Sequence, residues 1–229
     1  MELKLSVLAL CGFFLSLSVE ASVVVGGTRV VFDGNKKETS ISVENKDSSA
    51  NLVQTWVSAV ETGSPDKKAL IITPPLFRLN PGERNVLRIV RSGSALPENK
   101  ESMYWLNVKG ITAVEKGSVP THSLQLAINS RVKLIYRPAA LKSKPEDFAG
   151  KLRWRVENHQ LKVTNSSPHF MNFFEIKVAG KMLPAFTYVP PMSSASFSLA
   201  GKNPASGSKI EWSVINDFGT QGAVHRSVL

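Results

Sequence analysis

Alternation of apolar and polar residues limits this chain to β structure more strictly than any other feature of the sequence. Short runs rich in Val, Ile, Thr and aromatic residues repeat through the first half, and clusters of Gly, Pro, Asn and Asp separate them. No segment carries a sustained apolar stripe of helical period. The runs that we predict as strands here are residues 39–44, 52–57, 86–90, 103–108 and 123–137. Short strands at roughly ten-residue spacing predict an all-β chain built as a β-sandwich.

A segment bounded by two prolines divides the chain. Residues 138–145 (PAALKSKP) follow the longest predicted strand and interrupt the alternation. Further strand-like runs follow at residues 152–156, 160–164, 173–178, 196–199 and 209–215. We therefore predict two sandwiches, one over residues 22–140 and the other over residues 141–229.

The first 21 residues are predicted to be an export signal. Lys4 precedes an apolar run at residues 5–17, and Val19 and Ala21 provide the small residues of a cleavage site. The run is shorter than the roughly twenty residues that a membrane span needs. A lipoprotein signal ending at Cys11 is the alternative, but the apolar run continues past that residue. We predict cleavage after Ala21 and transport to an oxidising, exported compartment.

Cysteine and charge narrow the classes of function. Cys11 is the only cysteine, so the chain after the predicted cleavage has no disulfide and no Cys-based zinc site. The formal net charge of +10 is compatible with nucleic acid, an anionic membrane face or an acidic protein as partner. Lys and Arg are spread over both halves, without a basic helix or a basic stretch interleaved with aromatic residues. This distribution favours a solvated basic surface over nucleic-acid binding.

The sequence lacks the motifs of the common enzyme classes. It contains no G-x-G-x-x-G, no P-loop and no G-x-S-x-G, and its acidic residues are dispersed. The histidines form no metal-binding pair, because they stand far apart at His122, His159, His169 and His225. A glycosylation sequon at residues 165–167 (NSS) is short enough to arise by chance. We predict no catalysis, no metal and no cofactor.

Four stretches resemble the periplasmic pilus (fimbrial) assembly chaperones, the PapD-like family. They are TRVVFDGN at residues 28–35, TPPLFRLNPG at 73–82, LQLAINSRVKLIYRP at 124–138 and VINDFG at 214–219. The resemblance implies two immunoglobulin-like β-sandwich domains in an L-shape, like a boomerang, with an interdomain cleft. It also implies a periplasmic chaperone that binds, folds and caps pilus subunits by donor-strand complementation and delivers them to an outer-membrane usher. A self-capping homodimer is a further implied partner, whereas nucleic acid and membrane insertion are not expected.

The long strand carries the residues that such a chaperone would insert into its client. Leu124, Leu126 and Ile128 alternate, so they share one face of the strand. From the residues alone, a half-buried core strand is the simpler interpretation. The resemblance instead implies that these three side chains are the apolar donors that fill a groove in an incomplete subunit.

Five charged residues match family positions. The resemblance implies that Arg29 and Lys133 anchor the C-terminal carboxylate of the subunit, because an Arg fork and a Lys ammonium together can saturate a carboxylate. It further implies a buried ionic set of Glu101, Arg137 and Asp217 that joins the two domains. Unrelated surface charges are the alternative for both groups.

Loop length and domain number separate the remaining alternatives. The connection at residues 112–122 is short and has no cysteine, which resembles the branch of the family whose clients build rod-like pili. A secreted structural or adhesive β-sandwich, such as a pilus subunit, is the competing class. A subunit would usually have one domain, often a cysteine pair, and no match to Arg29 and Lys133.

Overall fold

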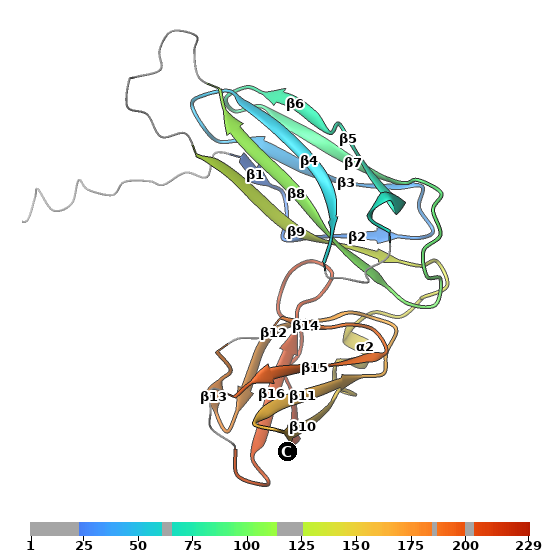
Figure 1. Ribbon diagram of the computed structural model, residues 1–229, viewed down its shortest axis with the longest axis vertical. Coiled ribbons are helices and arrows are strands. Elements are labelled where there is room, and N and C mark those ends of the chain that lie inside the picture. The colour runs from blue at the N-terminus through green and yellow to red at the C-terminus, as the bar shows by residue number, and fades with distance from the viewer. Residues whose placement is uncertain (1–22, 61–65, 114–125, 185–186, 200–203) are drawn as a thin grey trace, which may run out of the picture.

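The computed structural model describes residues 23–60, 66–113, 126–184, 187–199 and 204–229. Strands account for nearly all of the regular structure, and two β domains follow one another along the long axis (Figure 1). The all-β fold with two sandwich domains is therefore confirmed. The predicted cleavage after Ala21 and the predicted donor Leu124 lie outside the described residues.

The first domain consists of two sheets packed face to face. One sheet has the strand order β1-β3-β7-β5, and the other has the order β2-β9-β8-β4-β6. The strands are β1 (Val23–Val25), β2 (Arg29–Asp33), β3 (Glu38–Asn45), β4 (Asn51–Ala59), β5 (Leu70–Thr73), β6 (Leu76–Leu79), β7 (Arg84–Arg91), β8 (Ser102–Thr112) and β9 (Ala127–Arg137), with a short 3-10 turn η2 (Lys67–Ala69) before β5.

Alternate side chains of these strands form the first core. Val43 of β3, Ile89 of β7 and Leu106 of β8 are buried, as the period of two requires. The rings of Phe32 and Tyr136, on the neighbouring strands β2 and β9, lie 5.8 Å apart. Removal of this apolar surface from water is the main force that holds the two sheets together.

The N-terminal strand changes sheets at a pair of glycines. β1 pairs with β3, but after Gly26 and Gly27 the chain crosses over and β2 pairs in parallel with β9. A Cβ atom at Gly26 would lie 2.2 Å from the Ser42 hydroxyl and 3.2 Å from the Ser42 carbonyl oxygen, so a side chain at this crossing would have to displace Ser42. The β2–β9 register begins with Arg29 opposite Lys133, and β2 covers only the carboxyl-terminal part of β9.

The second domain repeats the sandwich arrangement with shorter strands. One sheet has the order β10-β11-β15, and the other has the order β13-β12-β16-β17, with β14 also paired to β12. The elements are α2 (Glu146–Ala149), β10 (Arg153–Glu157), β11 (Gln160–Asn165), β12 (Met171–Val178), β13 (Lys181–Met182), β14 (Tyr188–Val189), β15 (Ser193–Ser198), β16 (Lys209–Val214) and β17 (His225–Val228).

Aromatic side chains fill the core of the second domain. Trp212 is fully buried, and its ring lies 5.3 Å from that of Trp154, which in turn lies 5.4 Å from Phe173. The indole N–H of Trp212 donates to the carbonyl of Ala149 at 2.9 Å, so α2 closes one end of this core. The first core ends in sequence at Tyr136 and the second starts at Phe148. The division after residue 140 stays a prediction.

Candidate functional site

Two basic residues face each other on adjacent strands at the junction of the domains. Arg29 begins β2, and its register partner Lys133 lies in the second half of β9. The β2–β9 pairing therefore brings together residues that are more than one hundred positions apart in sequence. Both side chains are partly buried.

Arg29 reaches the second domain. Its Nη1 donates to the carbonyl of Ile215 at 3.3 Å, whereas its buried Nε has no hydrogen-bond partner within the described chain. Burial lowers the pKa of Arg29, and the negative charges of Asp217 and Glu146 partly oppose this effect. Arg29 thus retains hydrogen-bonding capacity that the described residues do not use.

Lys133 is a partly buried cation whose partners among the described residues are uncharged. Its Nζ donates to Asn172 Oδ1 at 2.5 Å and lies 5.2 Å from the centre of the Tyr188 ring. Burial, together with the like charge of Arg29, lowers the pKa of Lys133 to about 8. Among the ion pairs of the described residues, none involves Arg29 or Lys133. Two desolvated cations that have no ion-pair partner among the described residues form a site suited to a carboxylate.

The strand that carries Lys133 also has a free edge. β8 pairs with β9 from Ala127 to Tyr136, but β2 pairs only from Lys133 onward. Residues 127–132 therefore have no strand on their second edge in the described part of the chain. Ile128 is 58% exposed and Leu126, just before the strand, is 68% exposed. These two predicted donors are solvent-facing and do not belong to the first core.

The three predicted network residues are in direct contact. Arg137 donates from Nε to Glu101 Oε1 at 2.7 Å, and from its two terminal nitrogens to both oxygens of Asp217 at 2.7 and 2.8 Å. Burial disfavours the charged form of Arg137, but the hydrogen bonds and charges of Asp217 and Glu101 outweigh this effect and raise its pKa. For Asp217, burial is likewise outweighed by the Arg137 guanidinium, and the pKa of the carboxyl group is lowered. The contact joins the end of β9 to the loop after β16.

Sequence reasoning missed the other half of this network. The fully buried His169 ring lies between Glu101 and Ser143, with Nδ1 3.0 Å from Glu101 Oε1 and Nε2 2.8 Å from Ser143 Oγ. Glu101 Oε2 accepts the backbone N–H of Phe170 at 2.8 Å. The backbone N–H of Glu101 also donates to the carbonyl of Pro168 at 2.9 Å, so Glu101 of the first domain is bonded to three residues of the second. An isolated histidine has no sequence pattern that would have indicated this contact.

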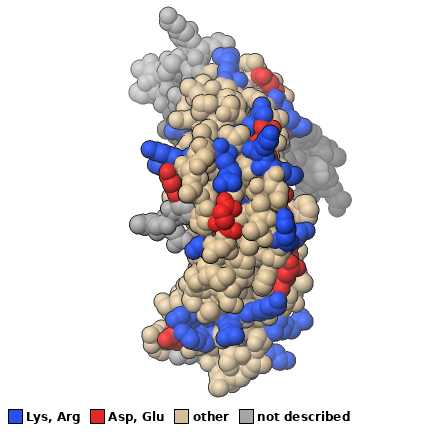
Figure 2. Space-filling model, turned by 90° about the vertical axis from the view of Figure 1, so that its right-hand side faces the viewer, with Lys and Arg blue, Asp and Glu red and all other residues tan. Residues whose placement is uncertain are grey.

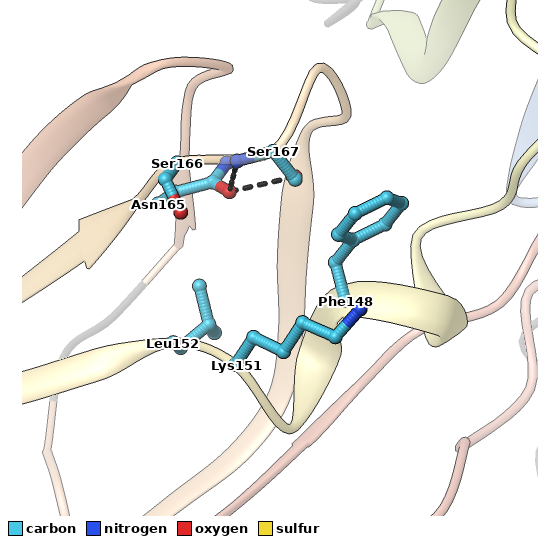
Figure 3. A pocket seen from close by; sticks show the side chains of 6 residues that line it. All are labelled: Phe148, Lys151, Leu152, Asn165, Ser166 and Ser167. Carbon is cyan, nitrogen blue, oxygen red and sulfur yellow. Dashed lines mark hydrogen bonds between the residues drawn. The ribbon is translucent and has the colours of Figure 1, made fainter.

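The glycosylation sequon has a structural role. Asn165 is buried, and its Oδ1 accepts both the backbone N–H of Ser167 at 3.0 Å and the Ser167 hydroxyl at 2.7 Å. Figure 3 shows this turn beside a small pocket that Phe148, Lys151 and Leu152 also line. The amide nitrogen that a glycan would occupy donates to the carbonyls of His169 and Pro190. The sequon is therefore part of the fold of the second domain.

The surface charge and the described residues give no sign of a further binding site of the common kinds. On the face that Figure 2 draws, Lys and Arg side chains occur on both domains, interspersed with Asp and Glu side chains and with uncharged surface. The described residues contain no cluster of three or more metal-binding side chains. None of the helices in this part of the chain has the length and hydropathy of a membrane span.

Comparisons with known proteins agree with the geometry. Residues 22–142 match the model of the pili and flagellar-assembly chaperone PapD N-terminal domain, and residues 147–225 match that of the PapD C-terminal domain. The chain is 38% identical to chaperone protein LpfB of Salmonella typhimurium over 208 residues, which cover 90% of this chain and 88% of LpfB. It is 36% identical to chaperone protein FimC of Escherichia coli over 224 residues, covering 95% of this chain and 90% of FimC.

Solved structures give the same assignment. The fold superposes with a TM-score of 0.82 and 37% identity on a chain from the Salmonella enterica SafA pilin in complex with the SafB chaperone, covering 93% of this chain and 98% of that one. The E. coli chaperone DraB matches with a TM-score of 0.79 and 34% identity, covering 91% and 96%. The sequence resemblance is therefore confirmed. This chain belongs to the PapD-like family of pilus assembly chaperones.

Proposed function

We propose that this chain is a periplasmic chaperone that captures pilus subunits by lending them a β-strand and passes them to an outer-membrane usher. The observation that carries the proposal is the free edge at residues 127–132, which leads directly to the cation pair Arg29 and Lys133. The family, and a relative solved as a chaperone–pilin complex, support the same function.

The free edge supplies the backbone part of the interaction. An incomplete β-sandwich exposes unpaired N–H and C=O groups along the gap where a strand is missing. Residues 127–132 offer the complementary groups, because β8 uses only one edge of β9 there. The client would thus complete its sheet on β9 by β-augmentation.

Exposed apolar side chains supply the second part. Leu126 and Ile128 are two residues apart on the chain, so they point to the same side, and both are largely exposed. Transfer of each into an apolar groove gains roughly 1.5–3 kcal/mol. We include Leu124, one alternation earlier, in the same donor row.

The cation pair sets the register of the client. β2 begins at Arg29, parallel to β9, so a client strand on the free edge must end where β2 begins. A client strand whose C-terminal carboxylate meets Arg29 and Lys133 consequently runs parallel to β9. Ile128 lies five residues before Lys133, about 16 Å along the strand, so anchoring the carboxylate fixes which client residues face the donors.

The network of Glu101, Arg137 and Asp217 would hold the two domains around this site. Its contacts lie at the carboxyl end of β9, four residues beyond Lys133. Loss of every partner would leave a buried charge unpaired at a cost of about 3–5 kcal/mol, but Arg137 keeps its pair with Glu101 when Asp217 alone is neutralised, so that change costs less. We assign the network a structural role with no direct client contact.

The predicted leader fits this function. We propose that export with cleavage after Ala21 delivers the chain to the periplasm, where clients and usher meet. We further propose that two free copies cap each other's exposed edges when no client is bound, because an open apolar edge otherwise promotes aggregation. The relatives are chaperones, a class without catalysis, and the pilus-subunit alternative is not favoured.

Substitution in the donor row tests the proposal. Ile128→Glu and Leu126→Glu place a charge in the apolar groove of the client, so the pilus subunit should no longer co-purify from periplasm. Val86→Glu on β7 is the matched control, because Val86 is similarly exposed but lies in the other sheet. Capture that persists in both donor variants would overturn the proposal. Circular dichroism separates this result from unfolding, which would favour a core strand.

A further inference from the structure

Phe218 has the highest exposed fraction of the large hydrophobic side chains in the described residues, at 86%. It lies in the loop between β16 and β17, which extends from the second domain toward the first (Figure 1). Isolated exposed hydrophobic residues are common on protein surfaces, so exposure alone carries no conclusion. The loop and its neighbours provide the further evidence.

Hydrogen bonds order the backbone of this loop without any contribution from the Phe218 ring. Asn216 Oδ1 accepts the backbone N–H groups of Phe218 and Thr220, each at 3.0 Å. The N–H of Gly219 donates to the carbonyl of Asn216 at 3.0 Å, and Gly219 adopts a φ of +85° that favours glycine. Phe218 is consequently presented on an ordered turn, although its ring is not needed to form that turn.

The turn is joined to the first domain on both sides of Phe218. Asp217 forms the two hydrogen bonds to Arg137, and a Cβ atom on Gly219 would lie 2.3 Å from the Thr28 hydroxyl. Thr28 directly precedes Arg29, whose Nη1 bonds to Ile215 at the start of the same loop. Phe218 therefore belongs to a segment that packs on the Arg29 end of the proposed carboxylate site.

We propose that Phe218 contacts the side chain that a client carries next to its C-terminal carboxylate, and that it selects clients with an apolar residue there. This inference rests on the proposed function and adds the second domain to client recognition. Both oxygens of Asp217 accept hydrogen bonds from Arg137, so this neighbouring carboxylate is already paired. The occupant thus has one charged end for Arg29 and Lys133 and an apolar side chain for the Phe218 ring.

Two synthetic peptides test the proposal. Each alternates valine and threonine and has a free C-terminal carboxylate, but one ends in phenylalanine and the other in serine. The intact protein should bind the phenylalanine peptide roughly tenfold more tightly, since one apolar contact is at stake. Phe218→Ser should remove this preference. Phe174→Ser is the matched control, because Phe174 is an exposed phenylalanine of the same domain, on β12, and its substitution should leave the preference unchanged.

Amidated versions of both peptides keep the two proposals apart. If free and amidated peptides bind the intact protein equally, the carboxylate site itself is wrong and the proposed function fails. If the free carboxylate is required but Phe218→Ser retains the tenfold preference, only the role of Phe218 is refuted. If Phe218→Ser changes the sedimentation of the peptide-free protein but keeps the peptide preference, Phe218 is a contact between two copies of the chain. That result would also overturn the inference.

Discussion

Replacement of Lys133 by methionine should separate binding from stability. Methionine has a similar length and is apolar, so it removes the charge while filling most of the same volume. The variant should lose carboxylate-dependent peptide binding. Without peptide, the variant should nevertheless remain folded, because the partly buried charge of Lys133 destabilises the folded native chain.

The magnitude follows from the pKa of Lys133. Burial and the charge of Arg29 lower this pKa from 10.5 to about 8. At about 1.4 kcal/mol per pKa unit, the charged form costs the folded state about 3 kcal/mol at pH 7. Loss of the ammonium leaves Asn172 Oδ1 without its donor, which costs about 1–3 kcal/mol. The free energy of unfolding of Lys133→Met at pH 7 should therefore equal or exceed that of the native chain.

The pH dependence isolates the charge itself. Because the folded pKa lies below the unfolded pKa, the unfolded chain binds more protons between pH 8 and pH 10.5, and stability rises with pH. The native chain should therefore gain about 1 kcal/mol relative to Lys133→Met between pH 7 and pH 9. Urea unfolding of both proteins, followed by tryptophan fluorescence, measures this difference. A difference that stays constant with pH, or a strongly destabilised variant at pH 7, would refute the reasoning.

Three further perturbations follow from the structure. Peptide affinity should fall as the pH rises above 8, by up to about tenfold per pH unit, because Lys133 loses its proton in the free protein. Titration calorimetry at pH 7 and pH 9 measures this change, and equal affinities at the two pH values would contradict it. Asp217→Asn should lower the free energy of unfolding at pH 7 by about 1–3 kcal/mol. Because Arg137 lowers the pKa of Asp217, this loss should become smaller as the pH falls below about 4. Equal melting temperatures of the variant and the native chain, with unchanged small-angle scattering, would contradict this. Gly26→Val should destabilise the first domain by about 1–3 kcal/mol, because the valine side chain would clash with Ser42. A melting temperature of this variant as high as that of the native chain would show that the sheet crossing does not need glycine.

Alternation predicted the longer strands because burial on one face imposes a period of two on the sequence. The predicted runs 39–44 and 103–108 lie within β3 and β8. The two-residue strands β13 and β14 are too short to carry a period, and they form through their pairing with β12. The crossing at Gly26 was also missed, because glycine in a sequence does not reveal which backbone approaches it.

Residues of the site were recognised where a motif surrounds them, and missed where only the tertiary structure brings them in. Arg29 and Lys133 stand in motif stretches, although only the parallel β2–β9 register shows that they are neighbours. No sequence pattern marks His169, just before β12, or Asn172, the second residue of β12. His169 nevertheless contacts Glu101, and Asn172 contacts Lys133, across the domain junction. Such contacts depend on how two separate domains are placed, which local sequence does not encode.

Amide hydrogen exchange of β9 tests the central claim most directly. The amides of residues 127–132 that point away from β8 should exchange fast in the monomeric free protein, because β2 does not reach them. Addition of a strand peptide with a free C-terminal carboxylate should slow their exchange, while its amidated form should protect them far less. Protection of these amides in the monomer without peptide would contradict the free edge at residues 127–132. Equal protection by both peptides would contradict the claim that a carboxylate bound by Arg29 and Lys133 sets the register of the client strand.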